Sequence, residues 1–231
     1  MTNNWTTPQR PNDYTEQALV QAILDGSFAV GSSLPGERTL AAELGVTRPT
    51  LREAIQRLTR DGWLTVHHGK PTLVNDYWRD GGLNVLSTLV QHSDQLPPNF
   101  VANLLDVRLH LAPAYTRAAV DNDPTQPSAL LNQAANLPDT AVAFATFDWT
   151  LHHCLTVASG NPIYTLILNG FANFYEQIAQ LYFALPNARG ASRAFYEGLA
   201  TAVANQDALT AETLTRQVME QSIVLWESSS Q

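Results

Sequence analysis

The chain has 231 residues and a formal net charge of −8, with 45% hydrophobic and 15% charged residues. This balance is typical of a folded globular protein and excludes a disordered chain. No apolar run reaches the roughly 18 residues of a membrane-spanning helix, and the amino-terminal segment has no secretory signal pattern. Because Cys154 is the only cysteine, we exclude a disulfide framework and expect a cytoplasmic protein without membrane contact.

The charge is divided unevenly along the chain. Residues 1–79 contain eight basic and eight acidic side chains, whereas residues 80–231 contain five basic and thirteen acidic ones. Between residues 36 and 72 the basic side chains outnumber the acidic ones by six to four. This division indicates an amino-terminal module suited to an anionic partner, followed by an acidic body, although chance asymmetry is the alternative.

The first part of the chain predicts a winged helix-turn-helix. A helix over residues 15–25 is followed by a loop, a short helix over 37–44 and a second helix from Thr47 or Arg48 to residue 60. Gly45 separates the last two helices, Thr47 is a favoured cap residue, and Pro49 suits the first turn. Residues 62–75 carry the strongest strand pattern of the chain, around a turn with Gly69 and Pro71. We therefore expect a DNA-binding domain over residues 1–75 with a small β-hairpin wing.

The second helix of this module carries the residue types that read DNA. Arg48, Arg52 and Gln56 recur every four residues on one face, with Thr50 near the start of the helix. Arginine can donate two hydrogen bonds to a guanine edge, and threonine can reach a base edge or a thymine methyl group. The hairpin tip, His68-Gly69-Lys70, is small enough at its glycine to enter a minor groove and adds the only lysine of the chain. The alternative is an ordinary solvated helix face.

The second part of the chain predicts an all-α bundle. We expect residues 76–82, with their Gly-Gly pair, to form a hinge, and residues 83–231 to form a helical domain. Proline, glycine and asparagine breaks divide this domain into about seven helices. Their expected ranges are 83–91, 97–120, 126–136, 139–158, 162–184, 188–204 and 207–227. Each helix carries an apolar stripe, so the domain is predicted to bury a sizeable core.

Several side chains of the helical domain could line a ligand cavity. Arg108 lies on a mainly apolar helix, and Asp148 and His152 share a helix face. An aromatic stripe over residues 171–182 adds further candidates, but such a stripe more often belongs to a core, and Arg108 could simply pair with Asp106 or Asp148. No nucleophile motif is present, since a G-x-S-x-G sequence is missing and Cys154 does not share a helix face with His153. We therefore expect no catalytic residues and no enzyme.

The motifs of the amino-terminal module resemble those of a known family. The run from Leu34-Pro-Gly-Glu-Arg38 to Thr47-Arg48-Pro-Thr-Leu-Arg52 is similar to the GntR family of bacterial transcription regulators. The continuation Asp61-Gly-Trp-Leu-Thr-Val-His-His-Gly-Lys resembles specifically its acyl-CoA-responsive FadR branch. The resemblance implies that operator DNA is contacted in the major groove and along its backbone by Arg38, Arg48, Thr50 and Arg52, and in the minor groove by His68, Gly69 and Lys70. Pro49 departs from the threonine of that branch.

The resemblance extends into the helical domain through residues 103–108, 158–164, 166–170, 182–183 and 195–196. It implies a cavity that holds a long-chain acyl group as its coenzyme A thioester. Carried over by position, the cavity residues are Leu104, Leu105, Arg108, His152, Tyr182, Tyr196, Ser222 and Trp226. Met219 and Gln221 depart from the glycine and glutamate of that branch.

Related ligand domains of the GntR family bind a metal ion through one aspartate and three histidines. Asp148 and His152 match the first half of that pattern, but the positions of the other two histidines correspond to Tyr196 and roughly to Val218. Because two ligands rarely hold a metal ion, we expect no metal site and no cofactor.

The resemblance as a whole implies a homodimeric regulator of fatty-acid degradation and biosynthesis genes that long-chain acyl-CoA releases from its operator. Three alternatives stay open. The effector could be a different small molecule, such as a carboxylate. The bundle could serve only dimerisation, without an effector. An enzyme acting on acyl-CoA is the alternative from another functional class.

Overall fold

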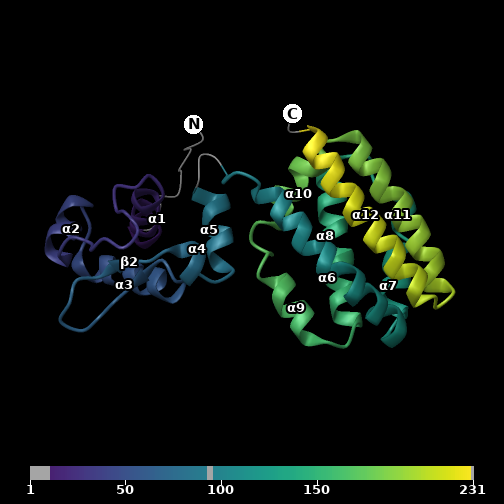
Figure 1. Ribbon diagram of the computed structural model, residues 1–231, viewed down its shortest axis with the longest axis horizontal. Helices are drawn as coiled ribbons and strands as arrows, with labels where there is room; N and C mark the ends of the chain where they lie inside the picture. Colours follow the sequence, from purple (N-terminus) through teal and green to yellow (C-terminus); the bar gives the residue numbers. More distant parts are fainter. Residues whose placement is uncertain (1–10, 93–95, 230–231) are drawn as a thin grey trace, which may run out of the picture. The chain divides into compact units, whose positions relative to one another are not determined.

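The computed structural model describes residues 11–92 and 96–229, and the chain divides into two compact units, Met1–Leu96 and Pro97–Gln231. The outer ends of both predicted domains lie outside the described residues. Helices make up most of both units, and a two-stranded antiparallel sheet lies in the first (Figure 1). This confirms the mainly α fold class with a small hairpin wing. Among the described helices, none combines the length and the apolar character needed to cross a lipid bilayer.

The first unit is built on three helices, α1 (Pro11–Leu24), α2 (Glu37–Glu43) and α3 (Arg48–Arg60). Both α1 and α2 pack against α3. The apolar face of α3 is fully or almost fully buried, and it consists of the four predicted residues Leu51, Ala54, Ile55 and Leu58. The Thr47 hydroxyl accepts a hydrogen bond from the Thr50 amide, so the predicted cap forms.

The wing is shorter than the sequence suggests. Its strands are β1 (Leu64–Thr65) and β2 (Leu73–Val74), paired with Leu64 opposite Val74 and Thr65 opposite Leu73. Val66, expected in the first strand, lies beyond it with 51% of its surface exposed. The segment before α2, expected to be a loop, runs beside β2, since the amide of Gly31 donates to the Val74 carbonyl at 2.8 Å and Ser33 forms a bridge with Leu73.

The segment expected to be a hinge is folded against the first unit. Residues 76–82 contain the short helix α4 (Tyr77–Asp80), and the Tyr77 ring lies 4.6 Å from the Trp63 ring, centroid to centroid. A Cβ atom on Gly62 would lie 2.6 Å from the Asp80 carbonyl oxygen, and Gly62 has φ +89°. Glycine is therefore required where the two segments meet.

The next helix, α5 (Asn84–His92), packs against α1. Its first residue, Asn84, donates a hydrogen bond from its amide nitrogen to the Asp61 carboxylate at 3.1 Å. Residues 83–91, predicted to open the helical domain, thus belong to the first compact unit, which extends to Leu96.

The second unit is a helical bundle. Its elements are α6 (Phe100–Asn122), α7 (Thr125–Leu131), a 3-10 turn (Ala134–Asn136), α8 (Ala141–Ala158), α9 (Pro162–Asn169), α10 (Tyr175–Phe183), α11 (Pro186–Ala204) and α12 (Ala208–Ser229). Helix α12 lies along α6 and α11, and α8 packs against α6, α9 and α10 (Figure 1). The core between these helices is rich in aromatic side chains, including Phe144, Phe183 and Tyr196.

The single helix predicted over residues 162–184 is in fact two. The break spans residues 170–174, between α9 and α10. Gly170 ends α9, as expected for a residue that costs roughly 1 kcal/mol relative to alanine inside a helix. Phe174, whose φ of −135° is not helical, buries its ring here. The break therefore places Phe171 and Phe174 on the wall of the cavity described below.

Candidate functional site

Arg48 and Arg52 project into solvent from the first half of α3. Their side chains are 56% and 55% exposed, and both point toward one carboxylate oxygen of Glu37, at 3.5 Å and 2.8 Å respectively. Arg38 is also exposed, without an ion pair to any described residue, and Thr50 is half-buried beside the helix cap. Two guanidinium groups of α3 are thus held by one acidic side chain, and a third, from α2, is exposed without an ion pair to any described residue.

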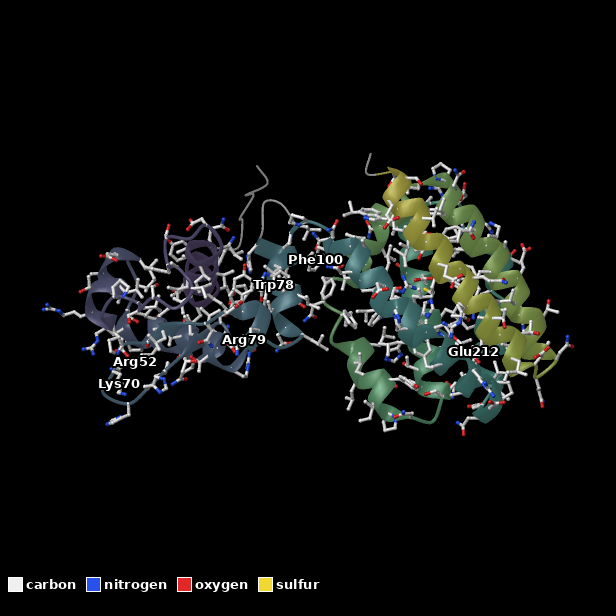
Figure 2. All side chains as sticks on the ribbon, viewed as in Figure 1. Arg52, Lys70, Trp78, Arg79, Phe100 and Glu212 are labelled. Carbon is white, nitrogen blue, oxygen red and sulfur yellow. The ribbon has the colours of Figure 1, made fainter. Side chains whose placement is uncertain are left out.

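The hairpin tip adds a further positive charge. His68, Gly69 and Lys70 are exposed, and the Lys70 amide closes the turn by donating to the His67 carbonyl at 3.2 Å. Gly69 has φ +70°, and a Cβ atom added to it would meet nothing within 4 Å, so its role is the backbone turn rather than tight packing. In the view of Figure 2, Arg52 and Lys70 both lie toward the lower edge of the first unit.

A cavity lies inside the second unit, between α6, α9 and α10. Its volume is about 70 Å³. Its walls are mainly apolar, and they include Leu104, Leu105, Leu111, Ile167, Phe171, Phe174 and Ile178. Arg108 is the one charged residue among the described residues that line it, and the other polar groups are tyrosine hydroxyls. A few placed polar groups in an apolar wall are typical of a small-molecule site.

The polar groups of the cavity converge on Asp148. One carboxylate oxygen accepts from the Arg108 guanidinium at 2.8 Å and, at short range, from the Tyr175 hydroxyl. The other oxygen accepts from the Tyr196 hydroxyl at 3.1 Å. The Arg108 guanidinium also lies 5.4 Å above the Tyr175 ring, a cation–π arrangement. Helices α6, α8, α10 and α11 are therefore joined by one buried cluster.

The charges in this cluster follow from burial and from the ion pair. Burial opposes ionisation of Asp148, but the Arg108 guanidinium, His152 and the Tyr175 hydroxyl together outweigh burial and hold the pKa of that carboxyl well below its usual range. Burial lowers the pKa of His152, which leaves its imidazole neutral. The neutral ring meets the Tyr115 hydroxyl through Nδ1 at 2.7 Å. Burial also raises the pKa of Tyr182, to about 12, so this hydroxyl keeps its proton.

Four of the eight ligand residues carried over from the resemblance line the cavity. They are Leu104, Leu105, Arg108 and Tyr182. His152 and Tyr196 lie one layer behind the wall, bonded to Tyr115 and Asp148. Ser222 is buried and donates to the Met219 carbonyl at 2.7 Å, and Trp226 packs against the core. The described cavity thus gathers only part of the predicted set.

Sequence reasoning missed two tyrosines of the cavity wall, Tyr115 and Tyr164. Tyr115 lies two helical turns after Arg108, with Leu111 between them, so the spacing of three and then four residues along α6 would have identified it. Tyr164 comes from α9, and its ring lies 5.8 Å from that of Tyr115. No local signal distinguishes Tyr164 from an ordinary core residue.

Asp148 and His152, the half of the metal-binding pattern that the sequence contains, both belong to the polar cluster. Among residues 11–92 and 96–229, no three His, Cys, Asp or Glu side chains come close enough to hold a metal ion. The nearer nitrogen of His152 lies 3.6 Å from Asp148, and the remaining partners of that carboxylate are a guanidinium and tyrosine hydroxyls.

Comparison with protein families covers most of the chain. Residues 12–74 match the model described as bacterial regulatory proteins of the gntR family, and residues 75–231 match the FadR C-terminal domain. The protein belongs to the GntR family. Within it, the carboxy-terminal match assigns the chain to the FadR branch, which confirms the resemblance of its motifs.

Relatives of this FadR-type chain carry the same assignment. The fatty acid metabolism regulator protein of Shewanella pealeana is 41% identical over 218 residues, which cover 94% of this chain and 91% of the relative. The protein of that name from Yersinia pestis is 43% identical over 193 residues, covering 84% and 81%. The solved structure of Lar, which controls expression of the Listeria monocytogenes agr system, has a TM-score of 0.57 at 17% identity, covering 96% of this chain and 98% of that one, and supports the fold alone.

These matches determine the functional class. Proteins of the GntR family are DNA-binding transcriptional regulators, so this FadR-type chain is a regulator and not an enzyme. Its partners are DNA, through the amino-terminal unit, and a small-molecule effector, through the FadR C-terminal domain.

Proposed function

We propose that the protein binds operators of fatty-acid degradation and biosynthesis genes as a cytoplasmic homodimer, and that long-chain acyl-CoA releases it from them. The observation that carries this proposal is the cavity between α6, α9 and α10, whose wall is apolar apart from Arg108 and tyrosine hydroxyls. An acyl chain needs such a wall, and burying each methylene group stabilises the complex by about 0.8 kcal/mol. The names of the relatives in Shewanella and Yersinia support the same pathway. No cofactor is required.

On the DNA side, the proposal assigns the major groove to α3 and the minor groove to the hairpin tip. Arg48 and Arg52 are exposed over more than half of their side-chain surface, so both guanidinium groups can exchange Glu37 for base edges or phosphates. Lys70 adds a phosphate contact at the tip. A homodimer places two such modules against the halves of a palindromic site, because a two-fold protein reads a two-fold sequence.

The effector acts only if acyl-CoA binds one arrangement of the dimer better than the other. That difference in affinity is what shifts the protein away from the DNA-binding state, and by linkage operator DNA weakens acyl-CoA binding by the same factor. The proposal therefore predicts that two ratios are equal. One is the ratio of operator affinities with and without effector, and the other is the ratio of effector affinities with and without operator.

The alternative effector, a small carboxylate, would use Arg108 as its anchor. Arg108 already donates to Asp148 at 2.8 Å, so an incoming carboxylate would have to compete with a buried partner. This contact favours a ligand recognised by its chain over one recognised by its charge.

A gel shift with a fatty-acid operator, repeated with increasing oleoyl-CoA, tests the proposal. We expect a specific complex that oleoyl-CoA dissociates and that an acetyl-CoA control leaves intact. Sedimentation of the free protein should give the mass of two chains. A specific complex that no long-chain acyl-CoA dissociates would overturn the effector assignment.

A pair of tryptophan variants locates the effector site. Leu104→Trp fills the cavity, so we expect normal operator binding that oleoyl-CoA no longer reverses. The matched control is Val142→Trp, at an exposed position of α8 that does not line the cavity. It should respond to oleoyl-CoA like the parent protein.

A further inference from the structure

Lys70 provides the only lysine amine of the chain, at the tip of the hairpin. The residue is exposed and forms no ion pair with any residue that the structure describes. Residues 62–75 contain no acidic side chain, so nothing nearby in the sequence holds its ammonium group. Figure 2 shows Lys70 at the lower edge of the first unit, pointing away from the ribbon. Its Nζ atom is therefore accessible to a small reagent in solution.

Two imidazoles accompany this amine on the same turn. The Lys70 amide donates to the His67 carbonyl at 3.2 Å, which closes the turn, and Gly69 adopts φ +70° within it. Such a turn brings the Cα atoms of its first and fourth residues to within about 7 Å of each other. His67 and His68 are both exposed, and neither imidazole forms a hydrogen bond with the described part of the chain. Histidine is the side chain that most often accepts protons in catalysis, so the turn combines an amine with two proton acceptors.

We propose that Lys70 is a modification site that small acyl thioesters, such as acetyl-CoA, acylate, and that this acylation weakens DNA binding through the wing. A neighbouring imidazole takes one proton from the ammonium group, and Nζ then forms a bond to the thioester carbonyl carbon. The carbon–sulfur bond breaks, and the leaving thiolate takes the second proton, which gives free coenzyme A and an amide. No group is oxidised or reduced. The amide carries no charge, so the chain loses its only lysine cation.

The effect on DNA rests on the proposed role of the hairpin tip in the minor groove. Loss of one phosphate contact lowers affinity for every sequence and decreases the slope of log affinity against log salt concentration by about 1. The guanidinium groups of Arg38, Arg48 and Arg52 keep their charge, so binding is weakened and not abolished. The modification acts on free protein, because bound DNA covers the tip. Acetyl-CoA added to a formed complex therefore leaves that complex intact.

The parent protein provides the first test. Free protein is incubated with acetyl-CoA at neutral pH and desalted. It is then analysed by tandem mass spectrometry and by fluorescence anisotropy with operator and random duplex over a range of salt concentrations. We expect an acetyl group on Lys70, weaker binding to both duplexes and a slope smaller by about 1. Operator bound before the incubation should protect Lys70. An unmodified Lys70, or a modified protein that binds DNA like the parent, would overturn the inference.

A lysine placed elsewhere tests whether the turn activates the amine. Arg79 is exposed on α4, has no ion pair with a described residue and has no histidine within ten positions in the sequence. In the variant Arg79→Lys, the new amine and Lys70 compete for acetyl-CoA within one molecule. We expect Lys70 to be acetylated at least about threefold faster than position 79, because only Lys70 has adjacent proton acceptors. Equal rates would show that Lys70 is an ordinary surface amine and would overturn its assignment as a site.

Two substitutions of Lys70 separate this inference from the proposed function. Lys70→Arg has no lysine amine, so incubation with acetyl-CoA should not change whatever DNA affinity this variant has. Lys70→Gln resembles the uncharged product and should bind DNA more weakly without any treatment. If Lys70→Gln binds like the parent protein, the proposed contact of the wing fails, and the effect of acylation fails with it. If Lys70→Gln binds more weakly but acetyl-CoA leaves Lys70 unmodified, only the acylation is wrong.

Discussion

The two units use arginine–carboxylate pairs in opposite ways. On α3, Arg48 and Arg52 share the exposed carboxylate of Glu37. In the helical bundle, Arg108 is paired with Asp148 inside a cluster closed by tyrosine hydroxyls. An exposed pair contributes about 0–1 kcal/mol and exchanges readily for a phosphate, whereas breaking a buried pair by removing one partner costs about 3–5 kcal/mol. Burial, rather than the chemical identity of the pair, decides which arginine is available to a partner.

The buried pair provides the largest predicted effect. Asp148→Ala leaves Arg108 without its carboxylate and should lower the free energy of unfolding by about 3–5 kcal/mol, measured by urea denaturation. The matched control is Asp139→Ala, which removes a carboxylate that is mostly exposed while paired with Arg189. That change should cost less than about 1 kcal/mol. Equal losses would remove the distinction between the two kinds of pair.

The same carboxylate predicts how stability depends on pH. The pKa of Asp148 is lower in the folded protein than the usual value of about 3.9 in an unfolded chain. Its contribution is therefore complete at neutral pH and is lost progressively as the pH falls below about 4. Urea denaturation as a function of pH should show a steeper acid loss for the parent protein than for Asp148→Asn. Identical slopes would contradict the low pKa.

The exposed arginines come next in expected size. Arg52→Ala should weaken binding to the operator by about 1–3 kcal/mol and reduce the preference over random duplex, if this guanidinium reads a base. Arg57→Ala is the matched control on the same helix, because Arg57 pairs with Asp13 and Glu16 instead of Glu37. Gel shifts with both duplexes measure the two effects. Intact operator binding in Arg52→Ala would show that the recognition face is wrongly assigned.

The wing tip predicts a different signature. Lys70→Ala removes a single exposed charge, so affinity should fall for operator and random duplex alike, without loss of preference. The slope of log affinity against log salt concentration should decrease by about 1. A change confined to the operator would indicate base reading at the tip.

The smallest predicted effect concerns the carboxylate that the two recognition arginines share. Glu37→Gln keeps the shape of that side chain and removes its charge. Arg48 and Arg52 then no longer have to give up an ion pair with Glu37 when they contact DNA phosphates. Affinity for random duplex should rise by up to about fivefold, which matches an exposed pair worth less than about 1 kcal/mol. Fluorescence anisotropy at low salt measures this. A decrease would mean that Glu37 positions the arginines for DNA.

The amino-terminal unit was predictable because its signals are local. The cap at Thr47, the four buried residues of α3 and the hairpin turn at Gly69 are each specified by neighbours within a few residues. The packing of residues 76–82 was not predictable in this way. This segment is held in place because Gly62 lies close to Asp80. The sequence shows only a Gly-Gly pair there, which is equally typical of a flexible linker.

The helical bundle was predictable in its class but not in its interior. The pairing of Arg108 with Asp148 joins residues forty positions apart, and the sequence left Asp106 as an equal partner. From the sequence, the aromatic stripe over 171–182 was more readily explained as core. In the structure, the break at 170–174 places Phe171 and Phe174 on the cavity wall. His152 and Tyr196 show that position alone does not separate a wall residue from its supporting layer.

The contact of Tyr77 with Trp63, and the tight approach at Gly62, have a consequence for how such regulators can be recombined. The match to the gntR family model ends at residue 74 and the match to the FadR C-terminal domain begins at residue 75, but α4 and α5 belong to the first compact unit. A chimera spliced at residue 75 would graft a foreign segment onto the indole face of Trp63. One effector domain should therefore be exchanged for another after His92, so that the DNA-binding unit keeps α5, its last helix.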